Sequence, residues 1–102
     1  MIVVRRTFHC KTGHAGPAAE LFREVARITR EADPSAGATR IYTDLSGVTD
    51  RVVLETERNT FDHPRELTAA IHGHPDAPAV FAQLADHVAG AEVEFLQLED
   101  TL

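Results

Sequence analysis

The sequence has a single cysteine and no basic cluster, and each shortage excludes a class of protein. Cys10 alone cannot form an intrachain disulfide, and one sulfur cannot build a thiolate metal site. We therefore expect a reducing, cytoplasmic location. The 10 basic residues are dispersed among 16 acidic ones, which gives a formal charge of −6. Because nucleic acids and anionic membranes both favour a concentrated basic face, we expect neither as a partner.

Long apolar runs and phosphate-binding loops are also missing. No stretch approaches the roughly 20 apolar residues of a transmembrane helix, and the first residues, MIVVRRTF, lack the pattern of a signal peptide. The segment GHAGP has neither the spacing nor the lysine of a P-loop. The 102 residues are 43% hydrophobic and 25% charged, which is typical of a folded soluble protein. We predict one domain over residues 1–102.

Hydrophobic spacing predicts four strands and two helices, the second of which is broken. Alternating side chains indicate strands at 2–10, 40–45, 51–58 and 91–98. A helix is expected from Pro17, which suits a first turn, to the Asp-Pro pair at 33–34. The second helix is expected to begin with Asp62 as its cap, to break at HGHP, and to resume from Asp76 to Gly90.

The order β-α-β-β-α-β is the split βαβ pattern of a ferredoxin-like α+β fold, with a four-stranded antiparallel sheet and both helices on one face. Right-handed crossovers place the third strand between the first and the second. The fourth strand then adds on the other side of the first. One face of the sheet is left open. What covers or binds that open face is therefore the functional question.

Strand periodicity assigns side chains to the two faces of the sheet. The expected helix-facing set is Ile2, Val4, Phe8, Cys10, Ile41, Thr43, Leu45, Val52, Leu54 and Thr56. The expected open-face set is Val3, Arg5, Thr7, His9, Arg40, Tyr42, Asp44, Val53, Glu55 and Glu57. The last strand is ambiguous, because it carries large apolar residues on both parities: Val93 and Phe95 on one, Leu96 and Leu98 on the other.

An edge strand that is apolar on both faces needs a cover, and a second copy of the chain can supply it. Two sheets that meet open face to open face would enclose a β-barrel lumen between them. We therefore predict a homodimer, a dimeric α+β barrel, whose lumen is lined twice by the open-face side chains.

The hairpin at 40–57, RIYTDLSGVTDRVVLETE, resembles small NIPSNAP-like members of the dimeric α+β barrel superfamily. That resemblance implies a homodimeric fold. The superfamily includes antibiotic-biosynthesis monooxygenases, haem-degrading monooxygenases, small lyases and isomerases, and many members with no assigned activity, so it implies a fold far more than a reaction. A haem site would need an axial histidine on a pocket-facing helix, and the chain has no tryptophan to match the family's. No cofactor is expected.

Two functions remain open for the lumen. In the first, a cofactor-independent monooxygenase- or cyclase-like enzyme binds a small hydrophobic or aromatic molecule, with His9 exchanging a proton and Tyr42 donating a hydrogen bond. The ligand-binding residues would be Arg5, Arg40, Glu55 and Glu57. In the second, these arginines and glutamates pair across adjacent strands. The domain would then be a non-catalytic dimerisation or ligand-sensing module.

The remaining histidines favour structural roles. His72 and His74 flank the expected helix break and have no third ligand at an obvious spacing, so no metal site is expected. His14 and His63 are expected at the surface. His87 is expected on the polar side of the last helix, where its charged form favours the negative helix end.

Overall fold

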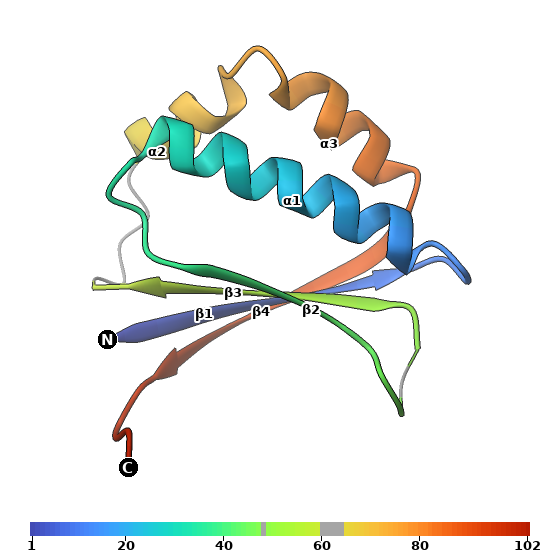
Figure 1. The fold of residues 1–102 in the computed structure, drawn as a ribbon. Coiled ribbons are helices and arrows are strands. Elements are labelled where there is room, and N and C mark those ends of the chain that lie inside the picture. Colours follow the sequence, from blue (N-terminus) through green and yellow to red (C-terminus); the bar gives the residue numbers. More distant parts are fainter. Residues whose placement is uncertain (48, 60–64) are drawn as a thin grey trace.

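The computed structural model describes residues 1–47, 49–59 and 65–102 (Figure 1). Within these residues the elements are, in chain order, β1 (Ile2–Cys10), α1 (Ala15–Ala32), β2 (Thr39–Thr43), β3 (Arg51–Arg58), α2 (Arg65–His72), α3 (Ala77–Ala85) and β4 (Val88–Gln97). The expected cap Asp62 and the expected surface residue His63 lie outside the described residues.

The four strands form one antiparallel sheet in the order β2-β3-β1-β4. The predicted α+β fold, with its order of elements and its antiparallel sheet, is therefore confirmed. All three described helices lie on one side of the sheet (Figure 1). Successive residues of β1 therefore alternate between the helix face and the open face. Arg5 lies opposite Glu55 of β3, and the next residue, Arg6, lies opposite Leu54.

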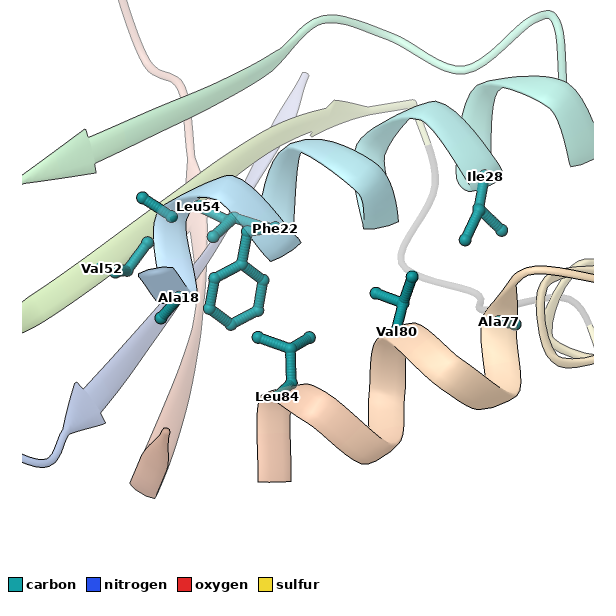
Figure 2. Packing of buried hydrophobic residues seen from close by; sticks show 9 residues of the cluster. Ala18, Phe22, Ile28, Val52, Leu54, Ala77, Val80 and Leu84 are labelled. Carbon is teal, nitrogen blue, oxygen red and sulfur yellow. The ribbon is translucent and has the colours of Figure 1, made fainter. Parts of the chain in front are cut away.

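The hydrophobic core lies where α1 meets the sheet and the two later helices. Val4 of β1, Ile28 of α1 and Val52 of β3 are fully buried. α3 turns an apolar stripe toward α1 (Figure 2). The core cluster comprises Ala18, Ala19, Phe22, Ile28, Val52, Leu54, Ala77, Val80 and Leu84. β4 receives little of this cover, because nearly all of its residues are exposed.

Two helix boundaries differ from those predicted. α1 begins at Ala15, two residues before Pro17, because the N–H groups of a first turn have no helical acceptor and a proline fits there at several positions. α3 ends at Ala85, so the prediction of a helix to Gly90 was wrong. Val88 and Gly90 instead belong to β4. Val88 fits the apolar stripe of a helix and the alternation of a strand equally well, and its pairing with Cys10 in the sheet decides between them.

The hairpin also departs from its predicted length. β2 ends at Thr43, and Leu45 is fully exposed, so the expectation that Leu45 faces the helices was wrong. Asp44 explains the early end of the strand. Its carboxylate accepts hydrogen bonds from the backbone N–H of Arg51 at 2.9 Å and from the Arg51 guanidinium at 2.8 Å, which closes the turn with side-chain rather than ladder contacts.

Candidate functional site

The open face of the sheet carries all six side chains that the sequence predicts for a site. The strand register places them on the side away from the helices: Arg5, His9, Arg40, Tyr42, Glu55 and Glu57. Their predicted roles stay predictions. What the geometry does establish is the partner that each of these groups has within the chain.

The arginines of the open face are paired with carboxylates on the neighbouring strand. The guanidinium of Arg5 donates to Glu55 through Nη2 at 2.7 Å and through Nε at 2.8 Å. Tyr42 donates its hydroxyl to the other oxygen of Glu55 at 3.3 Å. Arg40 lies 3.1 Å from the carboxylate of Glu57, which raises the pKa of Arg40. These cross-strand pairs satisfy the charges that an anionic ligand would otherwise meet.

His9 and Tyr42 have separate partners. The Nε2 of His9 lies 2.9 Å from Glu92 of β4, whereas Tyr42 contacts Glu55 of β3. The open face has a wide, shallow depression of about 550 Å³, and His9 is not part of its lining. The depression is lined by Arg5, Thr7, Tyr42, Arg51, Val53, Glu55 and Glu94. The two predicted catalytic side chains are therefore not brought to one pocket by this chain alone.

A larger cleft lies on the other side of the sheet, between the strands and the helices. Its volume is about 980 Å³, at the upper end of the range for small-molecule sites. Apolar side chains from every layer form its walls: Phe8, Phe22, Val25, Leu54, Leu67, Ile71, Phe81, Leu84 and Val88.

Aromatic rings line the cleft from both the sheet and the helices. Phe8 of β1 and Phe22 of α1 have ring centroids 4.3 Å apart. Phe81 of α3 packs against His72 of α2, with their ring centroids 5.2 Å apart, and both residues line the cleft. The sequence predicts a structural or solvent-exposed role for His72, and the side chain is exposed at the rim of the cleft. The walls suit a planar or apolar ligand body.

Arg6 is the unexpected member of the cleft. It stands on the helix-facing parity of β1, between Val4 and Phe8, and lines the cleft. Burial, together with the nearby positive charge of Arg58, lowers the pKa of Arg6. Among the residues that the structure describes, no carboxylate pairs with the guanidinium of Arg6 and no acceptor takes a hydrogen bond from that group. The sequence signal was available: a charged residue interrupts an otherwise apolar alternation from Ile2 to Cys10.

The two acidic residues in the described lining already have partners. Asp33 accepts hydrogen bonds from the backbone N–H of Ser35 at 3.0 Å and from its hydroxyl at 2.6 Å. Glu57 contacts the cleft from the end of β3, and its carboxylate pairs with Arg40 on the open face. Neither carboxylate therefore pairs with Arg6.

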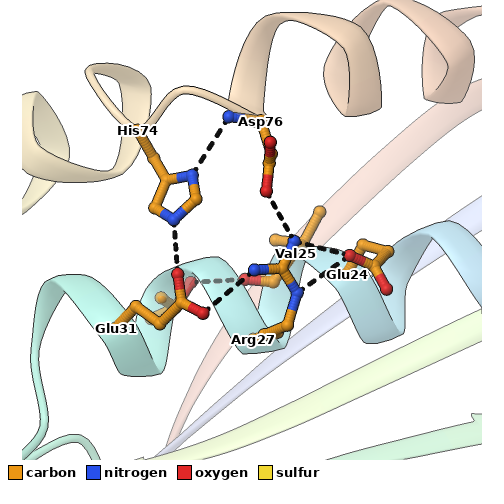
Figure 3. Close-up of polar contacts among 7 residues, drawn as sticks. Glu24, Val25, Arg27, Glu31, His74 and Asp76 are labelled. Atoms are coloured by element: carbon orange, nitrogen blue, oxygen red, sulfur yellow. Dashed lines mark hydrogen bonds and ion pairs between the residues drawn. The ribbon is translucent and has the colours of Figure 1, made fainter.

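His74 belongs to a network that ties α1 to the turn before α3 (Figure 3). Its Nε2 lies 2.5 Å from Glu31, and its Nδ1 accepts from the backbone N–H of Asp76 at 3.1 Å. Arg27 joins the same group through Glu24, Glu31 and Asp76, and these contacts raise its pKa. Asp76 is the N-cap residue of α3 as predicted, but its side chain binds Arg27 rather than the helix end. The role of His74 is structural.

His14 and His87 form a contact that the sequence did not indicate. Their Nδ1 atoms lie 2.8 Å apart, which requires one ring to donate and the other to accept. His87 lies in the turn between α3 and β4, so its expected place on a helix was wrong. Over the described ranges, no three His, Cys, Asp or Glu residues converge as a metal site, and no helix is long and apolar enough to cross a membrane.

Solved structures of similar fold place this geometry among known proteins. An uncharacterized NIPSNAP domain protein from Burkholderia xenovorans superposes with a TM-score of 0.77 at 19% identity, over 97% of this chain and 95% of that one. A NIPSNAP family protein from Agrobacterium tumefaciens gives 0.77 at 17% identity, over 97% and 93%. SnoaB, a cofactor-independent oxygenase from Streptomyces nogalater, gives 0.69 at 11% identity, over 99% and 95%.

Sequence comparison adds no closer relative: no protein-family model matches the chain, and no curated protein matches it. The structural matches nevertheless confirm the fold that the hairpin resemblance implied, that of NIPSNAP domain proteins.

Proposed function

We propose that the protein is a homodimer that binds a small apolar or aromatic molecule in the cleft between its helices and its sheet. The observation that carries this proposal is the cleft of about 980 Å³ with walls of Phe, Leu, Ile and Val. Ligand sites are concave, mostly apolar and provided with a few polar groups, and the cleft meets each of these conditions. The depression on the open face is smaller, at about 550 Å³, and more open.

The edge strand β4 supports the homodimer. Its Val93 and Phe95 are 53% and 41% exposed on the helix side, and Leu96 and Leu98 are 36% and 41% exposed. Exposed apolar residues on both faces of an edge strand invite pairing with another chain. A second copy that packs on the open face and along β4 would cover them.

The charge pairs of the open face support a structural role for the predicted lumen. Arg5 and Arg40 are already paired with Glu55 and Glu57, so an interface can cover these two arginines without leaving either of them unpaired. This favours the sealed-lumen alternative for the open face. We therefore propose that the ligand binds in the cleft rather than in the lumen.

An oxygenase activity on the bound molecule is a second candidate. The fold match to SnoaB, a cofactor-independent oxygenase, favours it. In this chain His72 lines the cleft against Phe81, and histidine is the side chain best suited to proton transfer near neutral pH. His72 would then serve as the base that activates a bound aromatic molecule.

Binding of N-phenyl-1-naphthylamine, a neutral dye that fluoresces in apolar surroundings, tests the proposed site. We expect saturable binding by the wild-type protein. The Ala26→Phe variant, which fills the cleft from α1, should weaken binding at least about tenfold. Ala70→Phe makes the same change on the exposed surface of α2, outside the lining, and should leave binding unchanged. Absence of saturable binding, or equal binding by wild type and Ala26→Phe, would contradict the proposal.

Light scattering coupled to gel filtration tests the oligomeric state. We expect twice the chain mass of 11.2 kDa at micromolar concentration. A stable species of one chain mass would overturn the homodimer.

A further inference from the structure

We propose that the ligand of the cleft is an amphipathic monoanion, an aromatic or long-chain carboxylate, whose charged group binds the guanidinium of Arg6. The inference rests on the proposed function, because it specifies the ligand of the same cleft. It assigns Arg6 as the residue that selects an anion over a neutral molecule of the same shape.

Arg6 differs from three other arginines of the sheet in its contacts with carboxylates. Arg5, Arg40 and Arg51 each contact a carboxylate within 3.1 Å. Arg6 has no such contact in the described part of the chain, although it lies on the central strand and is half-buried. Removing charged groups from water without a partner is costly, so such a group is usually paired. A ligand can supply that pair.

Apolar side chains flank Arg6 in the sheet. Its cross-strand neighbours are Leu54 on one side and Val93 on the other, and neither can accept a hydrogen bond through its side chain. Burial and the charge of Arg58 lower the pKa of Arg6, so an anion in the cleft would relieve both penalties. A guanidinium remains charged in proteins and matches the two oxygens of a carboxylate.

The space beside the guanidinium of Arg6 is bounded by apolar rings. Phe8 follows Arg6 on the same face of β1 and contacts Phe22, so an apolar wall begins directly beside the guanidinium. The wall continues to Phe81 and His72 on the helices. A molecule with an anionic group at Arg6 would therefore lay its apolar body along these rings. This arrangement describes an amphipathic acid rather than an inorganic anion.

Two matched dyes separate the charge from the apolar body. 8-Anilinonaphthalene-1-sulfonate is N-phenyl-1-naphthylamine with one added sulfonate. We expect Arg6→Met to weaken binding of the sulfonate dye about tenfold to a hundredfold, as for loss of a charge-assisted hydrogen bond, and to change binding of the neutral dye less than about twofold. Arg6→Lys keeps the charge without the fork and should give an intermediate affinity. Arg23→Met removes an exposed arginine of α1 and is the matched control.

The outcomes distinguish the two proposals. If the neutral dye binds but Arg6→Met leaves the sulfonate dye unaffected, or weakens both dyes equally, the role of Arg6 is overturned and the cleft stands. If neither dye binds the wild-type protein, the proposed function fails and the inference with it. Competition extends the test to a carboxylate: decanoate should displace the neutral dye more strongly from wild type than from Arg6→Met, whereas 1-decanol should displace it equally from both.

Folding of the variants has its own check. Methionine replaces a half-buried charge that has no ion-pair partner among the described residues with an apolar chain of similar length, so the unliganded Arg6→Met protein should melt no lower than wild type. A lower melting temperature would indicate that Arg6 already has a stabilising partner inside the protein, and that result would also overturn the proposal.

Discussion

On the open face of the sheet Arg5 and Arg40 each meet a glutamate, at 2.7 and 3.1 Å, whereas Arg6, on the helix face of the same strand as Arg5, meets none among the described residues. The two faces have the same backbone scaffold and differ in how their charges are matched. Arginines that are already paired can be covered by another protein surface at less electrostatic cost than unpaired ones. We propose that Arg6, which has no carboxylate partner among the described residues, instead receives an anionic ligand in the apolar cleft.

Packing differs between core and cleft as well. Ile28 of α1 is fully buried and does not line the cleft. Ile71 of α2 is half-buried and forms part of the cleft wall. A side chain that borders an open space has fewer neighbours to lose, so the same truncation should have different effects at these two positions.

The largest expected effect is therefore on core stability. Ile28→Ala should lower the free energy of unfolding by about 2–5 kcal/mol, whereas Ile71→Ala should lower it by roughly 1 kcal/mol. Urea unfolding at one fixed protein concentration measures both, because the proposed dimerisation would make apparent stability depend on concentration. Equal losses would mean that the cleft wall is packed like the core, which contradicts an open cleft.

The next largest effect is expected on the open face. Glu55→Lys removes the partner of Arg5 and Tyr42 and places like charges side by side. Burying two unpaired positive charges in an interface is costly, so the proposed dimer should dissociate at roughly a hundredfold higher concentration, as measured by light scattering across a dilution series. Exchanging the two charges, Arg5→Glu with Glu55→Arg, should restore most of the affinity. A Glu55→Lys protein that remains dimeric on dilution would place the interface elsewhere.

The sequence sufficed for the fold because period-2 and period-3.6 patterns are local. Alternation in β1 and β3 predicted the faces of Arg5, Val52 and Glu55, and the chirality of crossovers then predicted the strand order. Leu45 and Val88 were misplaced for a different reason. Each fits two local patterns, and a tertiary contact decides between them: the Asp44 side chain in the first case and pairing with β1 in the second.

The candidate site was less accessible from the sequence. Parity places Arg6 on the helix face, but it does not reveal that α2 and α3 leave a cleft there, because that depends on how far the helices stand from the sheet. His9 and Tyr42 share the predicted face, but their distinct partners depend on β3 and β4 side-chain geometry. Periodicity assigns a residue to a face and cannot supply its neighbours.

Acid titration should affect both sides of the molecule in the same direction. The pKa of Asp44 is lowered from 3.8 by its bond to Arg51, and the pKa of Glu31 is lowered from 4.5 by His74 and Arg27. Because the unfolded chain binds protons first, these pairs stabilise the fold above those ordinary values and lose their contribution as the pH falls through the lower folded values. Melting temperature should therefore fall as the pH drops below about 4.5.

Two variants assign this acid sensitivity. Asp44→Asn and Glu31→Gln should each melt lower than wild type at pH 7 and show a shallower decline in acid, whereas Arg6→Met should keep the wild-type slope. An unchanged slope in both carboxylate variants would show that other acids govern the transition.

The smallest effects are expected from the two residues that the sequence predicts as catalytic. Tyr42→Phe removes one long hydrogen bond of 3.3 Å from a side chain that is 45% exposed, and should cost about 0.5 kcal/mol. His9→Ala removes an exposed contact with Glu92 and should cost less than about 1 kcal/mol. Neither change should alter dye binding by more than about twofold, because both side chains lie across the sheet from the cleft.

His72→Ala provides the comparison for these two variants, because His72 lines the cleft and contacts Phe81. Loss of this ring should weaken binding of the neutral dye about fivefold, as for removal of one aromatic contact. The comparison of these variants tests whether the ligand binds in the cleft or in the lumen. If Tyr42→Phe or His9→Ala weakens dye binding more than His72→Ala does, the ligand lies in the lumen between two subunits, and the matched charges of the open face serve the ligand rather than the interface.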